Sequence, residues 1–358
     1  MRVRNFCAGP AAIPEPVLEE VRSELLEWGN AGMSIMEMSH RSSIFDEVAS
    51  NAKQDFIELL DIPDEYDVLF LQGGATHQFS MVPLNFSSQE DSADYLLTGA
   101  WSKKAIVEGQ KYSKINIVAS SEADNFTHAP DSKLWNLDSN AKYFHYAPNE
   151  TIQGVAIHQP PDIDTPIVAD MSSVILSEPI DVSKFSLIYA GAQKNIGPAG
   201  LTIVIIQKEM FEKENSSNSN ILRYSQHSKN NSMLNTPPTF AWYMAGKVFK
   251  WLKSEGGLEV ICKKNYFKAN TLYQYIDESN FFSNPVAVEN RSIMNIPFIL
   301  ADNNLDSLFI EQAEQNGLLN LKGHRSLGGM RASIYNAMPI EGVHDLIEFM
   351  KDFEKTNG

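Results

Sequence analysis

Seven short apolar runs between residues 66 and 206 constrain the fold of this chain more than any other feature. Most of them lack the polar and apolar alternation of a strand with one solvent-facing side, so they are typical of strands covered on both faces. Helix-like patterns, loops and Gly or Pro residues separate the runs. They read YDVLFL, ADYLLT, KINIVA, AKYFHY, PIVADM, SLIYAG and LTIVII. This order predicts an α/β fold with a mostly parallel seven-stranded sheet and helices on either side.

Helical patterns and a change in the order of predicted helices and strands after residue 257 predict two domains. Apolar residues recur at helical spacing over residues 16 to 28, 46 to 60 and 240 to 257, and the Asn- and Ser-rich stretch 213 to 236 indicates a long loop or lid. Beyond residue 257 come a long helix, a strand near SIMNIPFIL, a helix near 306 to 316, the strand MRASIYN and a closing helix from about 341. We expect a large domain over residues 16–257 and a smaller α+β domain built from residues 1–15 and 258–358.

Composition and charge exclude several classes of protein. The net charge of −16 argues against nucleic acid or an anionic membrane as a partner, because both select for basic faces. The apolar runs are far shorter than the roughly 20 residues that cross a bilayer, and the amino terminus lacks a signal-like apolar stretch, so we expect a cytoplasmic protein. Cys7 and Cys262 are too few for a disulfide framework or a cysteine metal site, and no metal site is predicted.

Lys194 stands alone among small residues in the stretch YAGAQKNIGPAG, residues 189 to 200. It lies in a tight connection between two predicted strands, where Gly191 and Gly197 allow close backbone approach. A lysine forms a Schiff base only when its amine can lose its proton, which burial or nearby positive charge favours. A surface lysine in a turn is the alternative, so other residues must decide between the two.

Residues at two further strand ends have the chemical properties that a Schiff-base cofactor site beside Lys194 would need. Asp170 ends the run PIVADM, and a buried carboxylate there could hold a proton on a pyridine nitrogen so that the ring acts as an electron sink. A turn or helix cap is the alternative. In LFLQGGATHQF two glycines follow a strand, and a helix begins near Ala75 or Thr76, which points backbone N–H groups at an anion such as phosphate. This is not a P-loop, because no Gly-Lys-Ser/Thr follows, and a simple strand-to-helix turn would look the same.

Two other side chains suit a flat heteroaromatic ring at this edge of the sheet. Trp101 begins the helix after the next strand and could stack on the ring, although packing in the core or an interface is the alternative. Thr151, in APNETIQG, could donate its hydroxyl to a ring oxygen or cap a turn.

Taken together, the segments resemble the phosphoserine aminotransferase family, class-V aminotransferases with the pyridoxal-phosphate-dependent, aspartate-aminotransferase-like fold. The resemblance covers nearly the whole chain and includes MEMSHRS, LFLQGGATHQF, HYAPNETIQG, YAGAQKNIGPAG, NTPPTFAWY and GMRASIYNAMP. It implies pyridoxal 5'-phosphate as the cofactor, Lys194 as the Schiff-base lysine and proton carrier, and Asp170 as partner of the pyridine nitrogen. The other implied cofactor contacts are Ala75, Thr76 and Gln193 at the phosphate, Trp101 on the ring and Thr151 at the phenolic oxygen.

The resemblance also implies a shared site and a substrate. Asn235 and Thr236 would contact the cofactor phosphate from the other subunit of a homodimer. Arg331 would bind the substrate α-carboxylate, and the pairs His40–Arg41 and His324–Arg325 would bind a distal phosphate or the glutamate side chain. The implied reaction is reversible transamination of 3-phosphohydroxypyruvate with L-glutamate, giving O-phospho-L-serine and 2-oxoglutarate in serine biosynthesis. Formation of 4-phosphohydroxythreonine in pyridoxine biosynthesis is a second reaction that the resemblance leaves open.

Two departures and two alternatives remain open at this stage. Some relatives carry Gly-Arg where this chain has Ala75 and Thr76, and serines are frequent where it has Cys7 and Ala8, so substrate affinity could differ. A cysteine desulfurase would need a nucleophilic cysteine on a mobile loop, whereas Cys262 lies in a helical pattern. A cofactor-binding regulator without turnover is the non-enzymatic alternative.

Overall fold

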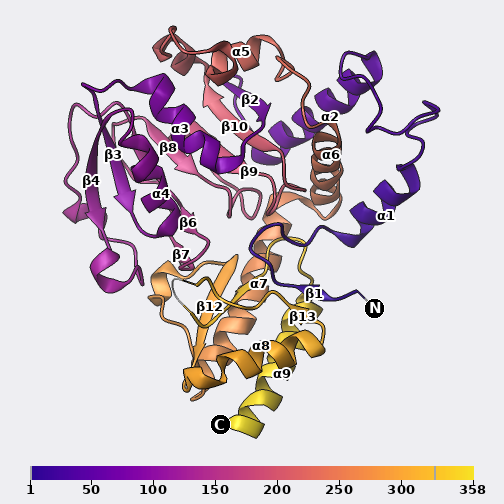
Figure 1. Cartoon of the computed structure of the whole chain (residues 1–358), viewed down its shortest axis with the longest axis vertical. Coiled ribbons are helices and arrows are strands. Elements are labelled where there is room, and N and C mark those ends of the chain that lie inside the picture. The colour runs from indigo at the N-terminus through magenta and orange to yellow at the C-terminus, as the bar shows by residue number, and fades with distance from the viewer. Residues whose placement is uncertain (1, 326–327) are drawn as a thin grey trace.

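The computed structural model describes residues 2–325 and 328–358, and it confirms the predicted sheet (Figure 1). Seven strands lie in the order β2-β10-β9-β8-β5-β3-β4. β10 runs antiparallel to both of its neighbours, and the other neighbouring strands run parallel. The strands are β2 (Tyr66–Leu71), β3 (Ser92–Leu97), β4 (Lys114–Ser120), β5 (Phe144–Tyr146), β8 (Ile167–Asp170), β9 (Leu187–Gly191) and β10 (Thr202–Gln207).

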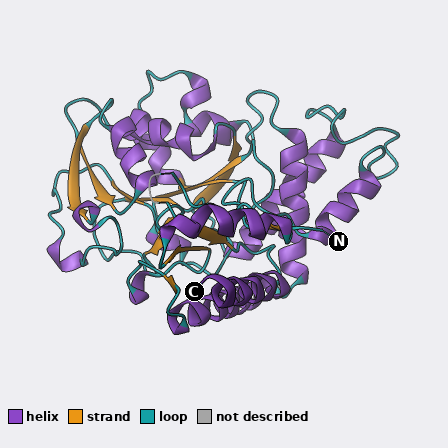
Figure 2. Cartoon of the chain, turned by 60° about the horizontal axis from the view of Figure 1, so that its bottom comes forward, coloured by secondary structure: helices purple, strands orange, loops and turns teal. Residues whose placement is uncertain are grey.

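Both faces of this sheet are covered, which explains why its apolar runs do not alternate (Figure 2). In β2, Val68 and Phe70 join one buried cluster, whereas Leu69 and Leu71 join a second cluster on the opposite face. The first cluster contains residues of α1 (Glu15–Glu24), α2 (Ser43–Leu60) and α6 (Thr239–Ser254); the second contains residues of α3 (Gly74–Phe86) and α4 (Ala100–Gly109).

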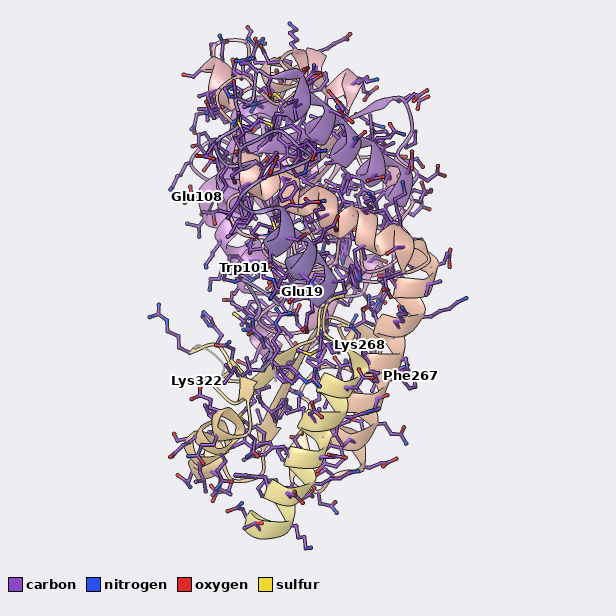
Figure 3. The ribbon with its side chains drawn as sticks, turned by 90° about the vertical axis from the view of Figure 1, so that its right-hand side faces the viewer. Glu19, Trp101, Glu108, Phe267, Lys268 and Lys322 are labelled. Atoms are coloured by element: carbon purple, nitrogen blue, oxygen red, sulfur yellow. The ribbon has the colours of Figure 1, made fainter. Side chains whose placement is uncertain are left out.

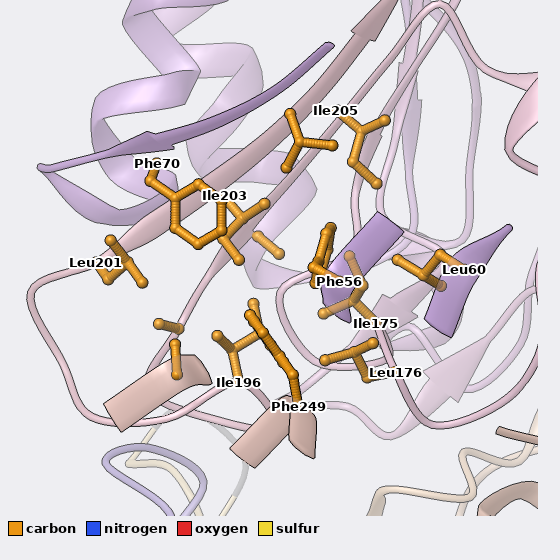
Figure 4. Packing of buried hydrophobic residues seen from close by; sticks show 14 of the residues in the cluster. Phe56, Leu60, Phe70, Ile175, Leu176, Ile196, Leu201, Ile203, Ile205 and Phe249 are labelled. Carbon is orange, nitrogen blue, oxygen red and sulfur yellow. The ribbon is translucent and has the colours of Figure 1, made fainter. Parts of the chain in front are cut away.

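Aromatic packing fixes α2 and α6 on the first face of the sheet (Figure 4). The ring of Phe70 stacks on Trp242 of α6 with a centroid separation of 4.3 Å, and Phe56 of α2 lies 5.1 Å from Phe249 of α6. Burying one such side chain contributes about 1.5–3 kcal/mol, so a few contacts of this kind are enough to hold the two helices against the strands.

The carboxyl-terminal part of the chain has a separate core, seen in the lower half of Figure 1. Phe6 belongs to this core, because β1 (Arg4–Asn5) pairs in parallel with β13 (Leu318–Leu319). The other elements are α7 (Gly257–Glu278), β11 (Phe282–Ser283), β12 (Asn295–Leu300), α8 (Asp306–Gln315), β14 (Met330–Ser333) and α9 (Ile340–Asn357). The domain boundaries given above stay a prediction.

The segment from residue 213 to 236 is more ordered than the loop that its composition predicts. It contains the helix α5 (Tyr224–Lys229), which is held by one fully buried aromatic side chain and by hydrogen bonds of Ser225 and Ser228 rather than by an apolar stripe. The Tyr224 ring stacks on Phe86 at 5.7 Å, and its hydroxyl donates to Gln78 Oε1 at 2.7 Å. One aromatic side chain and a few polar contacts leave no periodic apolar signal in the sequence, so the expectation of a loop was wrong at this point.

The remaining elements are short. A two-stranded hairpin pairs β6 (Asn149–Glu150) with β7 (Val155–Ala156). The 3-10 helices are η1 (Glu122–Asp124), η2 (Ser132–Leu134), η3 (Val182–Lys184), η4 (Lys208–Lys213), η5 (Asn220–Leu222), η6 (Val288–Asn290) and η7 (Asn303–Leu305). Among the described residues, none of the helices has the length and apolar character needed to span a membrane.

Candidate active site

A cavity at the carboxyl ends of the parallel strands gathers seven of the residues predicted from the sequence. They are Ala75, Thr76, Trp101, Thr151, Asp170, Gln193 and Lys194. The cavity is also lined by Gly74, Asn149, Ser172 and Ser173, which sequence reasoning did not single out. Residues scattered over more than 100 positions therefore share one site, as the carboxyl edge of a mostly parallel sheet requires.

The Lys194 side chain is buried in this cavity. The connection between β9 and β10 turns tightly, since the Ala192 carbonyl accepts hydrogen bonds from the backbone N–H groups of Lys194 and Gly197, both at 2.8 Å. Lys194 Nζ donates to Thr151 Oγ1 at 2.6 Å and lies 5.7 Å from the centroid of the Trp101 ring.

Burial lowers the pKa of the Lys194 amine to about 8, and the Arg331 charge acts in the same direction while Asp170 and Glu150 oppose it. A substantial fraction of the amine is therefore neutral, and so nucleophilic, near physiological pH.

Asp170 is the buried carboxylate at the end of β8. Its Oδ1 atom accepts a hydrogen bond from the Ser172 backbone N–H at 3.0 Å. Burial raises the pKa of Asp170, whereas the hydrogen bonds from Ser172 and the charge of Lys194 oppose that rise. A carboxylate in this environment gains from a cationic N–H partner, which a protonated ring nitrogen would supply.

The N-terminus of α3 forms the anion-binding side of the cavity. Its N-cap residue, Gly73, has φ of 93° and Gly74 has φ of 68°, a region that strongly favours glycine. Its N-cap glycine has no side chain to cap the helix, and among the first N–H groups that of Gly74 donates to Thr202 Oγ1 at 2.8 Å. Ala75 and Thr76 line the cavity in the first turn, where helical N–H groups have no intrahelical acceptor. The missing cap suits a phosphate group.

Trp101 lies in the first turn of α4 and is labelled in Figure 3. Its backbone N–H donates to Glu150 Oε2 at 3.0 Å, and its buried indole Nε1 has no hydrogen-bond partner among the described residues. The ring lines one side of the cavity, next to Lys194.

The cationic residues predicted to bind substrate are spread more widely. Arg331, on β14, shares a neighbouring cavity of about 210 Å³ with His324 and Gln153. Burial lowers the pKa of Arg331, and its Nε has no hydrogen-bond partner among the described residues. Arg325 is exposed and lines neither of these two cavities.

Two other predicted pairs stay outside both cavities within the single chain. His40 and Arg41 lie in the loop before α2, with His40 half-buried and Arg41 exposed. Asn235 and Thr236 are exposed, and the Thr236 carbonyl accepts from Gln72 Nε2 at 3.2 Å.

Sequence reasoning missed a buried polar network that joins the two parts of the chain. Asn149 Nδ2 donates to Ser173 Oγ at 2.8 Å and to Asn295 Oδ1 at 2.9 Å. Asn295 Nδ2 in turn donates to the Tyr335 hydroxyl at 3.1 Å, and that hydroxyl donates to the Ala8 carbonyl at 2.9 Å. The only signal in the sequence is the polar triplet before Ile152 in APNETIQG, which does not reveal burial.

A second buried lysine differs from Lys194 in its hydrogen-bond partners. Lys268, labelled in Figure 3, lies on α7, and burial lowers its pKa to about 7. Its Nζ donates to the carbonyls of Ile334, Tyr335 and Met338 at 3.2, 2.9 and 2.9 Å. The three hydrogens of its ammonium form are thus all engaged by backbone carbonyls, whereas Lys194 Nζ donates to a side-chain hydroxyl of the cavity, that of Thr151.

Comparison with known proteins gives the class first. The model of the family "Aminotransferase class-V" matches residues 3–346, and the chain belongs to this family. A phosphoserine aminotransferase of Acinetobacter baumannii (strain ACICU) is 55% identical over 359 residues, which cover 100% of both chains. Within the class-V family, the chain therefore groups with the phosphoserine aminotransferases.

Solved structures agree with that grouping. Phosphoserine aminotransferase from Bacillus circulans subsp. alkalophilus has a TM-score of 0.98 and 44% identity, covering 100% of this chain and 99% of the other. The pyridoxal-phosphate-bound enzyme from Trichomonas vaginalis has a TM-score of 0.94 and 42% identity, covering 98% and 100%. The cofactor of this chain is pyridoxal phosphate, and the uncapped α3 terminus, Asp170 and Lys194 fit its phosphate, ring nitrogen and aldehyde.

Proposed function

We propose that this chain catalyses reversible transamination between L-glutamate and 3-phosphohydroxypyruvate, giving O-phospho-L-serine and 2-oxoglutarate for serine biosynthesis in the cytoplasm. The observation that carries the proposal is the placement of Lys194: its buried amine, with a pKa lowered to about 8 by burial, faces Thr151, Asp170 and Trp101 in one cavity. The phosphorylated threonine precursor of pyridoxine is a second substrate to be tested beside the first.

The residues of the cavity have complementary tasks in this proposal. When bound, pyridoxal phosphate supplies an electron sink for the bond that breaks at the substrate α-carbon. Lys194 holds the cofactor and then, as a free amine, carries a proton as general base and acid. Asp170 keeps the ring nitrogen protonated, Trp101 covers the ring and Thr151 orients the phenolic oxygen. Gln193, with Ala75 and Thr76, binds the phosphate.

Substrate recognition falls to the cationic side chains. The half-buried Arg331, whose buried Nε lacks a described partner, would bind the α-carboxylate, because a guanidinium binds carboxylates in a planar, bidentate manner. His40, Arg41, His324 and Arg325 would bind the distal phosphate or the second carboxylate of glutamate. On a protein with net charge −16, such local cations are needed to attract a dianionic substrate.

The test of the reaction is direct. Purified protein is incubated with glutamate and 3-phosphohydroxypyruvate, and phosphoserine and 2-oxoglutarate are measured by mass spectrometry. Equal amounts of both products support the proposal, and a parallel reaction with the phosphorylated hydroxythreonine precursor measures the second activity. Sulfur release from cysteine without phosphoserine would favour the desulfurase alternative instead, although Cys262 lies on α7 and does not line the cavity.

We further propose a homodimer whose two sites each use residues from both subunits. Asn235 and Thr236 are exposed in the single chain and would bind the cofactor phosphate of the partner. The segment that carries His40 and Arg41 also exposes apolar side chains to solvent, with Leu26 88% exposed, which suits burial against a second copy.

Subunit mixing tests the shared site. We expect Lys194→Ala and the double variant Asn235→Ala/Thr236→Ala each to be impaired alone at limiting cofactor. Unfolded together and refolded, they should recover about a quarter of the wild-type activity, because half of the dimers are hybrids and each hybrid has one intact site. A mixture no more active than the average of its parts would place both residues in their own subunit's site.

The lowered pKa of Lys194 predicts how cofactor attachment depends on pH. Only the neutral amine attacks the aldehyde, and its fraction rises from about 10% at pH 7 to about 90% at pH 9 when the pKa is about 8. The rate at which apoprotein gains the visible absorption of bound cofactor should therefore rise about tenfold in total between these pH values and then level off. A rate that keeps rising tenfold per pH unit through pH 9 would contradict a lowered pKa.

A further inference from the structure

Glu150 is a fully buried carboxylate beside the site. The proposed chemistry of the cofactor and the substrate gives it no role. It lies on β6, directly before Thr151, and its side chain is 0% exposed. The Oε2 atom accepts a hydrogen bond from the Trp101 backbone N–H at 3.0 Å. Oε1 accepts from the Ser102 backbone N–H at 2.8 Å and from Ser102 Oγ at 2.6 Å. One carboxylate thus holds the first turn of α4.

The contact between this carboxylate and the helix is tight. A Cβ atom at Gly99 would lie 2.4 Å from the carboxyl carbon of Glu150, so any larger residue at position 99 would displace the carboxylate. On the other side, Gln153 Oε1 accepts from the Ala100 N–H at 3.2 Å. Side chains from residues 150 and 153 therefore hold three consecutive N–H groups of α4, a terminus that would otherwise be unsatisfied.

The hydrogen-bond pattern favours the ionised form of Glu150. Each of its oxygens faces a backbone N–H group, which can only donate. Ser102 Oγ accepts from the N–H groups of Thr98 and Gly99, both at 3.0 Å, so it acts as a donor toward Glu150 Oε1 at 2.6 Å and the Gly99 carbonyl at 3.1 Å. Burial raises the pKa of Glu150, and the bonds from Ser102 and Trp101 oppose that rise. The positive end of α4 adds to their effect.

We propose that Glu150 is a positioning residue that orients two cofactor-facing side chains, those of Trp101 and Thr151. Through α4 it fixes the Trp101 ring over the cofactor ring, and through the backbone it fixes the Thr151 hydroxyl against Lys194 Nζ. This inference rests on the proposed function for the meaning of the site, but its test uses cofactor binding and needs no substrate. Failure of the transamination assay would therefore leave it standing.

The charge of Glu150 has a separate effect at Lys194. A negative charge near the amine favours the ammonium form, and Glu150 acts on Lys194 in this direction, together with Asp170. Removing the charge should consequently make Lys194 lose its proton at lower pH. A residue that only stabilised the fold would not produce this shift.

The test compares Glu150→Gln with Glu108→Gln in the full-length protein. Glu108 lies near the other end of the same helix, where it is bonded to Lys111, and Figure 3 labels it above Trp101. In Glu150→Gln the amide NH₂ must face an N–H donor, so we expect the dissociation constant of pyridoxal phosphate from apoprotein to rise about 10- to 100-fold. Glu108→Gln should stay within about twofold of wild type.

Two further measurements separate positioning from general stability. The midpoint pH of cofactor attachment should fall in Glu150→Gln, and the effect of Glu150→Gln on cofactor affinity should shrink in a Trp101→Phe background if it acts through the ring. Ser102→Ala keeps the carboxylate but removes one of its hydrogen-bond donors, and it should weaken cofactor binding about threefold to tenfold. This variant replaces Glu150→Gln in the test if Glu150→Gln fails to fold. Unchanged affinity and midpoint in the folded variants would overturn the inference.

Discussion

Replacing Lys194 by alanine should lower kcat by at least about 10⁴-fold and abolish the visible absorption that pyridoxal phosphate gives on covalent attachment. The variant loses the only amine among the described residues that line the cavity, and with it the general base that moves the proton. The cofactor should still bind non-covalently, because the α3 N-terminus and Asp170 remain. The measurements are a steady-state assay and an absorption spectrum of the dialysed protein.

Two other lysine variants are the controls that show whether the loss of absorption is specific to Lys194. Lys133→Ala removes an exposed lysine of η2 and should leave both readouts at wild-type values. Lys268→Met removes the other buried lysine with a lowered pKa; it should lower the melting temperature, because three carbonyls lose their donor, while the visible absorption persists. If Lys194→Ala kept its absorption and Lys268→Met lost it, the assignment of the lysine would be wrong.

Replacing Arg331 by leucine should lower kcat/KM for both glutamate and 3-phosphohydroxypyruvate by about 10²- to 10³-fold, largely through KM. Both substrates present an α-carboxylate, and losing one member of a buried charge pair is typically worth this much. The buried Nε without a described partner indicates a cation prepared for an anion rather than one used inside the fold. The measurement is initial rates with each substrate varied in turn.

Lysine at position 331 and leucine at position 22 are the controls for this experiment. Arg331→Lys keeps the charge without the bidentate geometry and should recover only part of the loss. Arg22 is exposed and pairs with Glu19, so Arg22→Leu should change neither KM. An effect of Arg331→Leu on one substrate alone would show that the carboxylate common to both binds elsewhere.

The sheet and the core of the site could be predicted from the sequence because they depend on local patterns. Each strand coincides with an apolar run, and all of them except the edge strand β4 are buried on both faces, as Val68 and Leu69 illustrate by facing opposite clusters. Asp170 is the last residue of β8 and Lys194 lies three residues after the end of β9, so these neighbouring strands place both residues at the same edge of the sheet. Parallel packing then brings them together without further information.

The supporting residues could not be predicted, because their burial is decided by distant parts of the chain. Glu150 reads as an ordinary polar residue, and only the approach of α4, about 50 positions earlier, makes it a buried helix cap. In the same way, α5 depends on Tyr224 meeting Phe86, and Asn149 depends on Asn295 from the other part of the chain. Such contacts leave no periodicity.

The most direct test of the central claim is to locate the covalent link. The purified protein with its cofactor is reduced with borohydride, digested and mapped by mass spectrometry. Our account predicts one phosphopyridoxyl group, on the peptide that contains Lys194. A group on Lys268 or any other lysine, or a reduced protein that carries none, would contradict it.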